Sequence, residues 1–253
     1  MTPTPQEQQL QLLYRQLVRL FNKACADYSL IADNDHILVG LSGGKDSLAL
    51  VEMLGERQKI FVPRFRVSAA HIIVENIGYQ SDADYLRLFC EQHGVPFHLI
   101  TTRYEQQPRS RLQHNHCFLC SWYRRKALFD LAQQLGCNKI ALGHHKDDII
   151  QTMLMNIIYQ GSFSTIPPAL QMQKFKMQLI RPLCLIREEQ LQQLALLRQY
   201  KQVPKLCPYE KESSRAQVKQ LVGQLAQLNP HFYDSAWAAM ENIKTDYLPQ
   251  KKR

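Results

Sequence analysis

No hydrophobic run in this sequence is long enough to cross a membrane as a helix. Such a helix needs about 20 consecutive apolar residues, and no stretch of the chain approaches that length. The first residues, MTPTPQEQQLQ, also lack the basic start and the apolar core of a secretory signal peptide. We therefore expect a soluble protein that works in the cytoplasm and has no membrane partner.

Glycine and proline are scarce, and low-complexity sequence is absent. The 253 residues include 10 glycines and 12 prolines, and 45% of the residues are hydrophobic. This composition excludes a collagen-like chain and a disordered one. The length suits one large domain, or one domain with a small appendage, and the sequence contains no internal repeat.

Acidic residues are too few to balance the basic ones. The chain has 31 lysines and arginines against 22 aspartates and glutamates, which leaves a formal net charge of +9. This surplus of positive charge favours a polyanionic partner such as nucleic acid.

Cysteines are too few and too irregularly spaced for a disulfide framework. There are 7 of them, an odd number, and only Cys117 and Cys120 form a tight C-x-x-C pair. Free thiols, some of them ligands, fit a reducing compartment. The other cysteines are Cys25, Cys90, Cys137, Cys184 and Cys207.

Short apolar runs alternate with helical patterns along most of the chain. The expected strands are 36–41, 68–74, 97–101, 139–142 and 178–182, and the expected helices between and before them are 9–28, 48–54, 81–93, 122–135 and 147–159. This alternation predicts an α/β fold, a parallel sheet with helices on both faces.

The pattern after residue 186 is purely helical, with helices expected at 188–200, 215–228 and 233–244. We therefore predict three parts: an N-terminal helix in residues 1–30, an α/β domain in 31–186, and a small helical part in 187–253 that carries Cys207.

Six consecutive residues after the first expected strand suit an anion: Ser42, Gly43, Gly44, Lys45, Asp46 and Ser47. Glycines let backbone N–H groups turn toward a phosphate, the following helix adds a partial positive charge, and Lys45 with two hydroxyls completes the cradle. Open α/β sheets also bind ligands at the carboxyl ends of their strands. Because the glycine spacing of a Walker loop is absent, we predict a phosphate-binding loop of another class.

Two further clusters are candidates for metal or phosphate chemistry. The C-x-x-C pair precedes an expected helix that carries Arg124 and Arg125, and its spacing is compatible with a redox dithiol, half a zinc site or half a cluster site. Residues 143–148, G-H-H-K-D-D, follow another expected strand. The two aspartates cap a helix or face a nucleotide and Mg²⁺, and the two histidines are hydrogen-bonded turn residues or zinc ligands.

Four motifs occur in a recognisable order: S-G-G-K-D-S, C-x-x-C-S-x-x-R-R, G-H-H-K-D-D and R-P-L-C-L-I-R-E. Together they resemble the tRNA 2-thiocytidine synthetase (TtcA) family of PP-loop ATP pyrophosphatases, which cleave ATP between its α and β phosphates. The resemblance runs from about residue 15 to 225 and implies the Rossmann-like PP-loop fold for residues 31–186.

This resemblance implies roles for residues of the first, second and third motifs. The loop Ser42–Ser47 binds the pyrophosphate that leaves ATP, with Lys45 neutralising its charge and Asp46 holding Mg²⁺. Arg124, supported by Arg125, binds phosphate and acts in catalysis. Asp148, with Asp147 beside it, organises Mg²⁺ or the reacting oxygen.

The same resemblance implies that Cys117, Cys120 and Cys207 hold a 4Fe-4S cluster. The third ligand is identified by its place eight residues before Arg215. Family members commonly have a second cysteine in this later loop, whereas the corresponding residue here is Pro204. Three ligands leave one iron without a protein ligand.

The implied reaction is the ATP-dependent adenylation of the 2-oxygen of cytidine 32 in the tRNA anticodon loop. Sulfur carried on the open iron then replaces that oxygen, giving 2-thiocytidine, AMP and pyrophosphate. The implied partners are tRNA and a cysteine desulfurase as the sulfur donor. The sequence leaves open whether the chain forms a homodimer.

Several alternatives stay open at this stage. Lysidine synthetases share the PP-loop but need no cysteines, and 2-thiouridine synthetases usually carry terminal zinc fingers that this sequence lacks. An amide-forming AMP ligase would need an amine substrate and no iron. A non-catalytic RNA-binding module would instead hold zinc through Cys117, Cys120, Cys207 and either His144 or His145.

Overall fold

The structure is a computed structural model that describes residues 4–75, 82–103, 116–173, 175–201 and 214–249, with the backbone alone at 116–118. The chain divides into two compact units. Unit 1 consists of Met1–His145 and Pro167–Lys211, and unit 2 consists of Lys146–Ile166 and Glu212–Arg253. Among the described helices, none combines the length and the apolar character that a membrane crossing requires.

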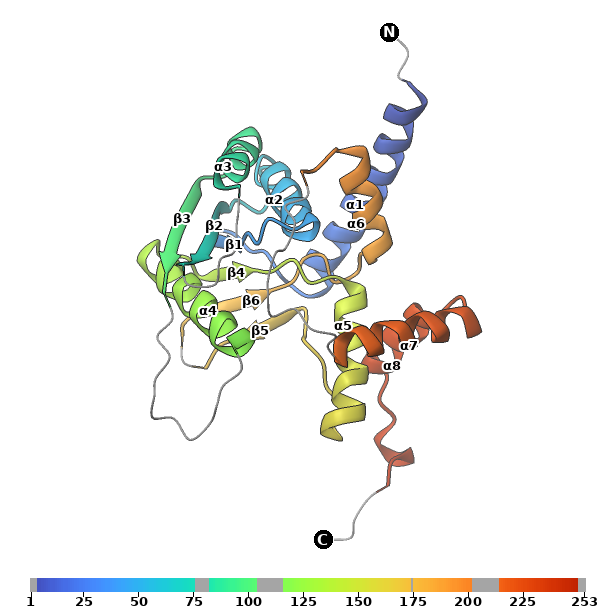
Figure 1. Ribbon diagram of the computed structural model, residues 1–253. Helices are drawn as coiled ribbons and strands as arrows, with labels where there is room; N and C mark the ends of the chain where they lie inside the picture. Colours follow the sequence, from blue (N-terminus) through green and yellow to red (C-terminus); the bar gives the residue numbers. More distant parts are fainter. Residues whose placement is uncertain (1–3, 76–81, 104–115, 174, 202–213, 250–253) are drawn as a thin grey trace, which may run out of the picture. The chain divides into compact units, whose positions relative to one another are not determined.

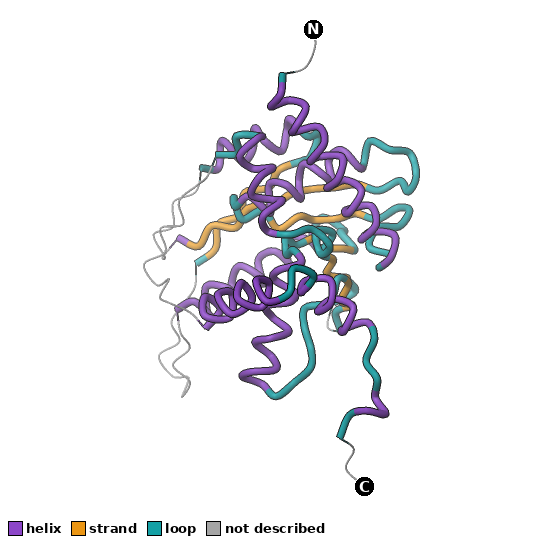
Figure 2. The backbone as a smooth tube through the Cα atoms, turned by 90° about the vertical axis from the view of Figure 1, so that its right-hand side faces the viewer, coloured by secondary structure: helices purple, strands orange, loops and turns teal. Residues whose placement is uncertain are grey.

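Unit 1 contains a six-stranded sheet in the order β3-β2-β1-β4-β6-β5. The strands lie side by side in two perpendicular views (Figures 1 and 2). Their bounds are β1 His36–Gly40, β2 Arg66–Val74, β3 Phe97–Thr102, β4 Lys139–Ala141, β5 Ala169–Gln171 and β6 Gln178–Ile180. All neighbours pair in parallel except β5, which is antiparallel to β6. The α/β fold predicted from the alternating pattern is thus confirmed, with one added edge strand.

The edge strand β5 is absent from the sequence prediction because it has no apolar run of its own. It is only three residues long, and two of the three are exposed. Its partner β6 determines its position through backbone hydrogen bonds, which leave no signature in side-chain periodicity.

In the described part of unit 1, five helices surround the sheet: α1 Pro5–Asp27, α2 Lys45–Arg57, α3 Ala83–Gln92, α4 His116–Gln134 and α6 Glu188–Leu197. Helix α1 begins with a capping box in which Thr4 and Glu7 exchange hydrogen bonds. Helix α4 begins six residues earlier than the sequence predicted, at His116 instead of residue 122. The C-x-x-C pair therefore lies within the first turns of this helix and not before it.

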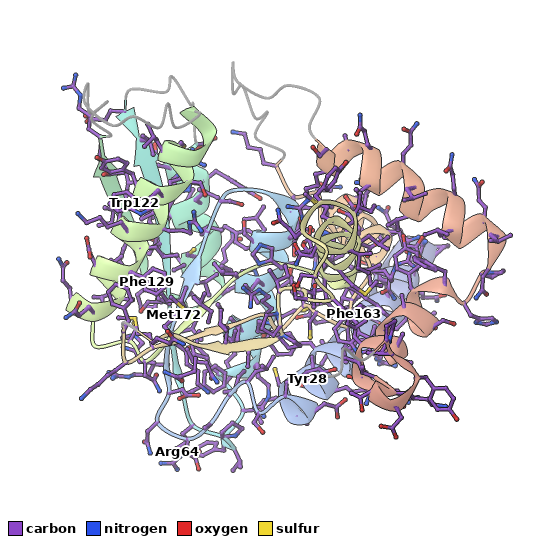
Figure 3. All side chains as sticks on the ribbon, turned by 90° about the horizontal axis from the view of Figure 1, so that it is seen from below. Tyr28, Arg64, Trp122, Phe129, Phe163 and Met172 are labelled. Atoms are coloured by element: carbon purple, nitrogen blue, oxygen red, sulfur yellow. The ribbon has the colours of Figure 1, made fainter. Side chains whose placement is uncertain are left out.

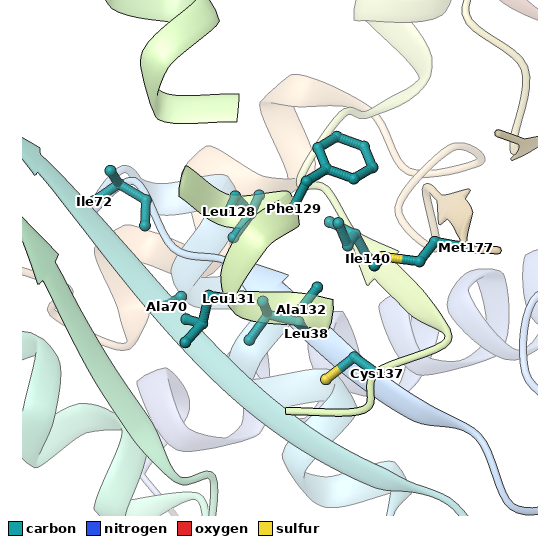
Figure 4. Close-up of a cluster of buried hydrophobic side chains, with 10 residues drawn as sticks. All are labelled: Leu38, Ala70, Ile72, Leu128, Phe129, Leu131, Ala132, Cys137, Ile140 and Met177. Atoms are coloured by element: carbon teal, nitrogen blue, oxygen red, sulfur yellow. The ribbon is translucent and has the colours of Figure 1, made fainter. Parts of the chain in front are cut away.

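The apolar core between α4 and the sheet holds these elements together (Figure 4). Side chains from α4 such as Leu128 and Leu131 pack against Leu38 of β1 and Ala70 of β2, and all four are at most 7% exposed. Such burial is the main favourable term in folding, at about 25 cal/mol per Å² of apolar surface removed from water. The sheet is therefore a rigid base for the loops at its edge.

Unit 2 has a separate apolar core. Its helices are α5 Lys146–Met155 with the π-helical turn η2 Asn156–Gln160, then α7 Ser214–Leu228, α8 Phe232–Glu241 and the short 3-10 turn η3 Thr245–Tyr247. Ile150 and Met153 of α5 cluster with Val222 of α7 and Ala236 of α8.

This grouping differs from the three parts predicted at 1–30, 31–186 and 187–253. Helix α5 clusters with α7 and α8, and it is grouped with them in unit 2. Helix α6 belongs to unit 1, because Arg198 and Tyr200 at its end bind the buried carboxylate of Glu52 in α2 at 2.7 and 2.5 Å. Chain order alone does not reveal which helix faces meet.

A buried ion pair stabilises the amino-terminal edge of the sheet. Lys139 Nζ lies 2.8 Å from Asp35, and their side chains are 9% and 4% exposed. Lys139 also donates to the carbonyl of Leu30 at 2.9 Å, and Asn138 donates to Asp35 at 2.7 Å. Every charge in the cluster is thus compensated within the fold.

The substitution Lys139→Met is expected to lower the free energy of unfolding by about 3–5 kcal/mol, because it leaves Asp35 buried without its counter-ion. The control Lys23→Met removes an exposed pair with Asp27, whose side chains are 60% and 43% exposed. That change is expected to cost less than about 1 kcal/mol. Urea denaturation measures both, and equal losses would contradict this account.

Candidate nucleotide site

The loop after β1 is a tight turn at the position where the sequence predicts a phosphate cradle. Gly43 has a φ of +83°, a left-handed conformation that favours glycine. Ser42 and Ser47 close the loop, since their hydroxyls lie 3.1 Å apart and the N–H of Ser42 donates to Ser47 Oγ at 3.2 Å. Ser47 Oγ also donates to the carbonyl of Gly44 at 2.8 Å. These contacts hold the loop in a tight turn at the carboxyl end of a buried strand.

Helix α2 starts directly from this turn, with Gly44 as the N-cap and Lys45 as the first helical residue. No side chain caps this helix end, so the loop presents a helix N-terminus with its partial positive charge. Lys45 Nζ lies 2.9 Å from Asp46 and 3.8 Å from Glu188. The amine therefore lies between two partly exposed carboxylates.

The loop lies at the point where the sheet reverses its strand order. From β1 the chain continues to β2 on one side, whereas β4 pairs with β1 on the other side. Open α/β sheets bind ligands in the crevice at this switch point. Gly143, just after β4, lies against the loop: a Cβ placed there would be 3.1–3.2 Å from backbone atoms of Asp46 and Ser47.

A buried histidine supports the start of the loop. His71 of β2 is 2% exposed, and its Nδ1 lies 2.7 Å from the carbonyl of Leu41. Burial lowers the pKa of His71, and the nearby charge of Arg124 lowers it further, against the opposing effect of the hydrogen bond. A neutral His71 therefore donates from Nδ1 to the residue before Ser42. The structure also brings the predicted phosphate-binding residue Arg124 near this strand.

This environment predicts a pH dependence of stability. An unfolded histidine has a pKa of about 6.5, so between that value and the lowered folded pKa the unfolded state binds more protons. The contribution of His71 is complete above about pH 6.5 and is lost as the pH falls toward the folded pKa. Urea denaturation at pH 5 and 7.5 is expected to show a smaller pH-dependent gain for His71→Gln than for the wild type. An unchanged gain would contradict this prediction.

The two candidate carboxylates of the third motif lie in the first turn of α5, in unit 2. Asp147 is buried, at 4% exposed, and Asp148 forms an ion pair with Arg215 of α7. Lys146 before them binds Asp234 of α8 at 2.5 Å. Sequence reasoning used Arg215 only to locate Cys207 and missed its pairing with Asp148, because the two residues are separated by 67 positions.

Only part of the predicted cysteine site falls within the described residues. Cys120 is half-buried on α4, where it packs with Leu119 and Tyr123 against Val74 at the carboxyl end of β2. The side chain of Cys117 and the whole of Cys207 lie outside the described residues. In the part of the chain that is described, no three His, Cys, Asp or Glu side chains are arranged to hold a metal ion.

The four cysteines outside the predicted cluster site have environments that disfavour the thiolate. Cys90, Cys137 and Cys184 are buried, and Cys25 is partly buried. Burial raises the pKa of Cys25, Cys90 and Cys184 to about 12 and that of Cys137 to about 11. Because a metal ligand must be a thiolate, these four residues are poor ligands.

Comparison with known proteins identifies the class of this site. A family described as the PP-loop domain, ATP_bind_3, matches residues 10–224. A solved U34-tRNA thiolase from Methanococcus maripaludis, NcsA, with its [4Fe-4S] cluster, has a TM-score of 0.75 and 27% sequence identity, over 92% of this chain and 82% of that one. The fold and the loop after β1 are those of the PP-loop class.

Curated relatives narrow the class further. The tRNA-cytidine(32) 2-sulfurtransferase of Bdellovibrio bacteriovorus is 34% identical over 236 residues, 92% of this chain and 89% of the relative. That of Alcanivorax borkumensis is 32% identical over 251 residues, 97% of this chain and 87% of the relative. The chain belongs to the tRNA-cytidine(32) 2-sulfurtransferase family of PP-loop proteins, and the resemblance inferred from the four motifs is confirmed.

Proposed function

We propose that this protein is a cytoplasmic tRNA sulfurtransferase that converts cytidine 32 of the anticodon loop into 2-thiocytidine and releases AMP and pyrophosphate. The observation that carries the proposal is the position of two motifs on one sheet. The phosphate-binding loop follows β1, and Cys120 packs against the end of the adjacent parallel strand β2. The two motifs therefore lie at the same edge of unit 1, as a reaction that combines phosphate and sulfur chemistry would require.

The residues of the loop have defined tasks in this reaction. The 2-oxygen of cytosine is a poor leaving group until adenylation turns it into AMP. Backbone N–H groups of Gly43 and Gly44 and the start of α2 bind the leaving pyrophosphate, while Lys45 moves from its carboxylate partners to neutralise that charge. Asp46 is freed by this movement and supplies a carboxylate to Mg²⁺ together with phosphate oxygens.

Four further side chains complete the set, and a fifth positions one of them. Arg124, with Arg125 beside it, binds phosphate from α4. Asp148, held by Arg215, and the adjacent Asp147 organise Mg²⁺ or the reacting oxygen. Because Arg215 restrains the carboxylate of Asp148 through a charged hydrogen bond, it acts as a positioning residue and not as a catalytic one.

The cysteines fit an iron–sulfur cluster by the chemistry of the donor set. Cys117, Cys120 and Cys207 would supply three soft thiolate ligands. A 4Fe-4S cluster held by these three cysteines would have one iron without a protein ligand, and that iron would supply the sulfur for transfer.

Reconstitution tests the whole proposal. Protein purified without oxygen is incubated with ATP, Mg²⁺, cysteine, a cysteine desulfurase, a thiol reductant that brings the persulfide sulfur to the sulfide level, and unmodified tRNA transcript. The digested nucleosides are analysed by mass spectrometry. We expect 2-thiocytidine at position 32, with AMP and pyrophosphate formed in equal amounts. Light scattering of the same preparation establishes whether the enzyme is a homodimer.

The same experiment tests a second candidate, thiolation of uridine, which is favoured by the likeness to the U34-tRNA thiolase. Formation of 2-thiouridine would replace the first assignment with the second. Formation of no thiolated nucleoside in the complete mixture would overturn the proposed function.

A further inference from the structure

An exposed tryptophan stands beside the proposed site. The chain has 2 tryptophans; Trp237 is 9% exposed, whereas Trp122 on α4 is 44% exposed. The apolar cluster beneath α4 is formed by residues further along the helix, such as Leu128 and Phe129, and does not include Trp122. The fold therefore gains little from this large ring.

Basic side chains lie close to the indole ring of Trp122. Lys126, one turn further along α4, places its Nζ 5.6 Å from the centre of the indole. Arg125 is exposed on the same helix, and its Nε donates to the carbonyl of Ser121 at 3.1 Å. An aromatic face flanked by cations is the arrangement that proteins use to stack an unpaired base and to neutralise its phosphates.

The position of the ring relates it to the proposed reaction. Trp122 is two residues beyond Cys120 and next to Tyr123, with the two ring centres 4.9 Å apart. Cys120 and Tyr123 pack on Val74, the last residue of β2. The indole therefore lies at the carboxyl edge of the sheet in unit 1, the edge that carries the phosphate-binding loop.

A second exposed aromatic residue provides an internal comparison. Phe61 is 73% exposed, and Arg64 lies 5.0 Å from the centre of its ring. It precedes β2 and so belongs to the opposite, amino-terminal edge of the same sheet. Figure 3 shows the labelled Trp122 and Arg64 far apart, at opposite ends of the unit.

We propose that Trp122 stacks on an unpaired base of the tRNA, with Lys126 binding an adjacent phosphate. This inference rests on the proposed function, since it requires tRNA as the substrate. Stacking on a protein side chain is needed because a target base must leave its own stack before the 2-oxygen is accessible. Stacking of the base on the indole of Trp122 would replace the base–base stacking that the tRNA loses.

Two measurements test the stacking. The first is tryptophan emission during titration with unmodified tRNA transcript, for the wild type and for Trp122→Phe. The difference between the two proteins isolates the signal of Trp122, and we expect that signal to be quenched on binding. The second is the dissociation constant for labelled tRNA at fixed salt, which we expect to rise about 5- to 100-fold in Trp122→Ala and much less in Trp122→Phe.

Control variants separate stacking from general effects. Phe61→Ala removes an exposed aromatic ring with a neighbouring arginine and is expected to leave tRNA affinity unchanged. Lys126→Ala is expected to reduce the slope of log affinity against log salt by about one. Circular dichroism of Trp122→Ala verifies that the variant is folded.

The outcomes distinguish the inference from the function on which it rests. If tRNA binds and is thiolated, but the emission of Trp122 and the affinity of Trp122→Ala are unchanged, stacking is overturned and the proposed function stands. If the wild type binds no tRNA, both are overturned.

Discussion

Cys120→Ala is expected to remove iron and acid-labile sulfide from protein purified without oxygen, and to abolish thiolation of tRNA. A cluster held by the three proposed ligands would have none to spare, so the loss of one would leave two thiolates, too few to hold it. Cys120 is the one ligand whose surroundings are described, half-buried against the end of β2. Its replacement by alanine removes a sulfur atom and leaves the helix intact.

Cys25→Ala is the matched control. Cys25 is also partly buried in a helix of unit 1, but burial raises the pKa of its thiol to about 12. We expect this variant to retain the iron, the sulfide and the activity of the wild type. Zinc is measured in the same samples: stoichiometric zinc without iron in the wild type would exclude the cluster and favour the zinc-binding module.

Gly143→Val is expected to lower kcat/KM for ATP by at least about 100-fold, the size of effect that a displacement of about 1 Å has on catalytic geometry. The reason is steric. Even the first carbon of a side chain at this position would be 3.1–3.2 Å from backbone atoms of Asp46 and Ser47, which have no flexible end to move aside. The phosphate-binding loop has to shift, and Gly143→Ala is expected to have a smaller effect in the same direction.

Gly223→Ala in α7 is the control for this series, since a Cβ there meets nothing within 4 Å. It is expected to leave ATP turnover unchanged and to stabilise the helix slightly. The measurements are pyrophosphate release at varied ATP concentration and the melting temperature of each variant. Unchanged ATP turnover in a folded Gly143→Val protein would refute the role given to this close approach.

Sequence reasoning was most direct where a predicted site lies in consecutive residues. Ser42–Ser47 is recognisable without a structure because a phosphate cradle needs glycine, hydroxyl and lysine next to each other at a strand end. The strand and helix pattern of the sheet was likewise predictable, since each buried strand carries its own apolar run. The start of α4 and the edge strand β5 were not predicted, because polar or short segments lack such a signal.

The sequence by itself thus determined the α/β class, the phosphate-binding loop, the cysteine pair and the family. Only the tertiary structure decided which side chains support these motifs: Gly143 against the loop, His71 beneath Leu41, and Arg215 on Asp148. It also decided that α5 joins α7 and α8 in a separate core. The physical reason is that local pattern specifies the type of each element, whereas contacts between distant residues depend on which faces pack together.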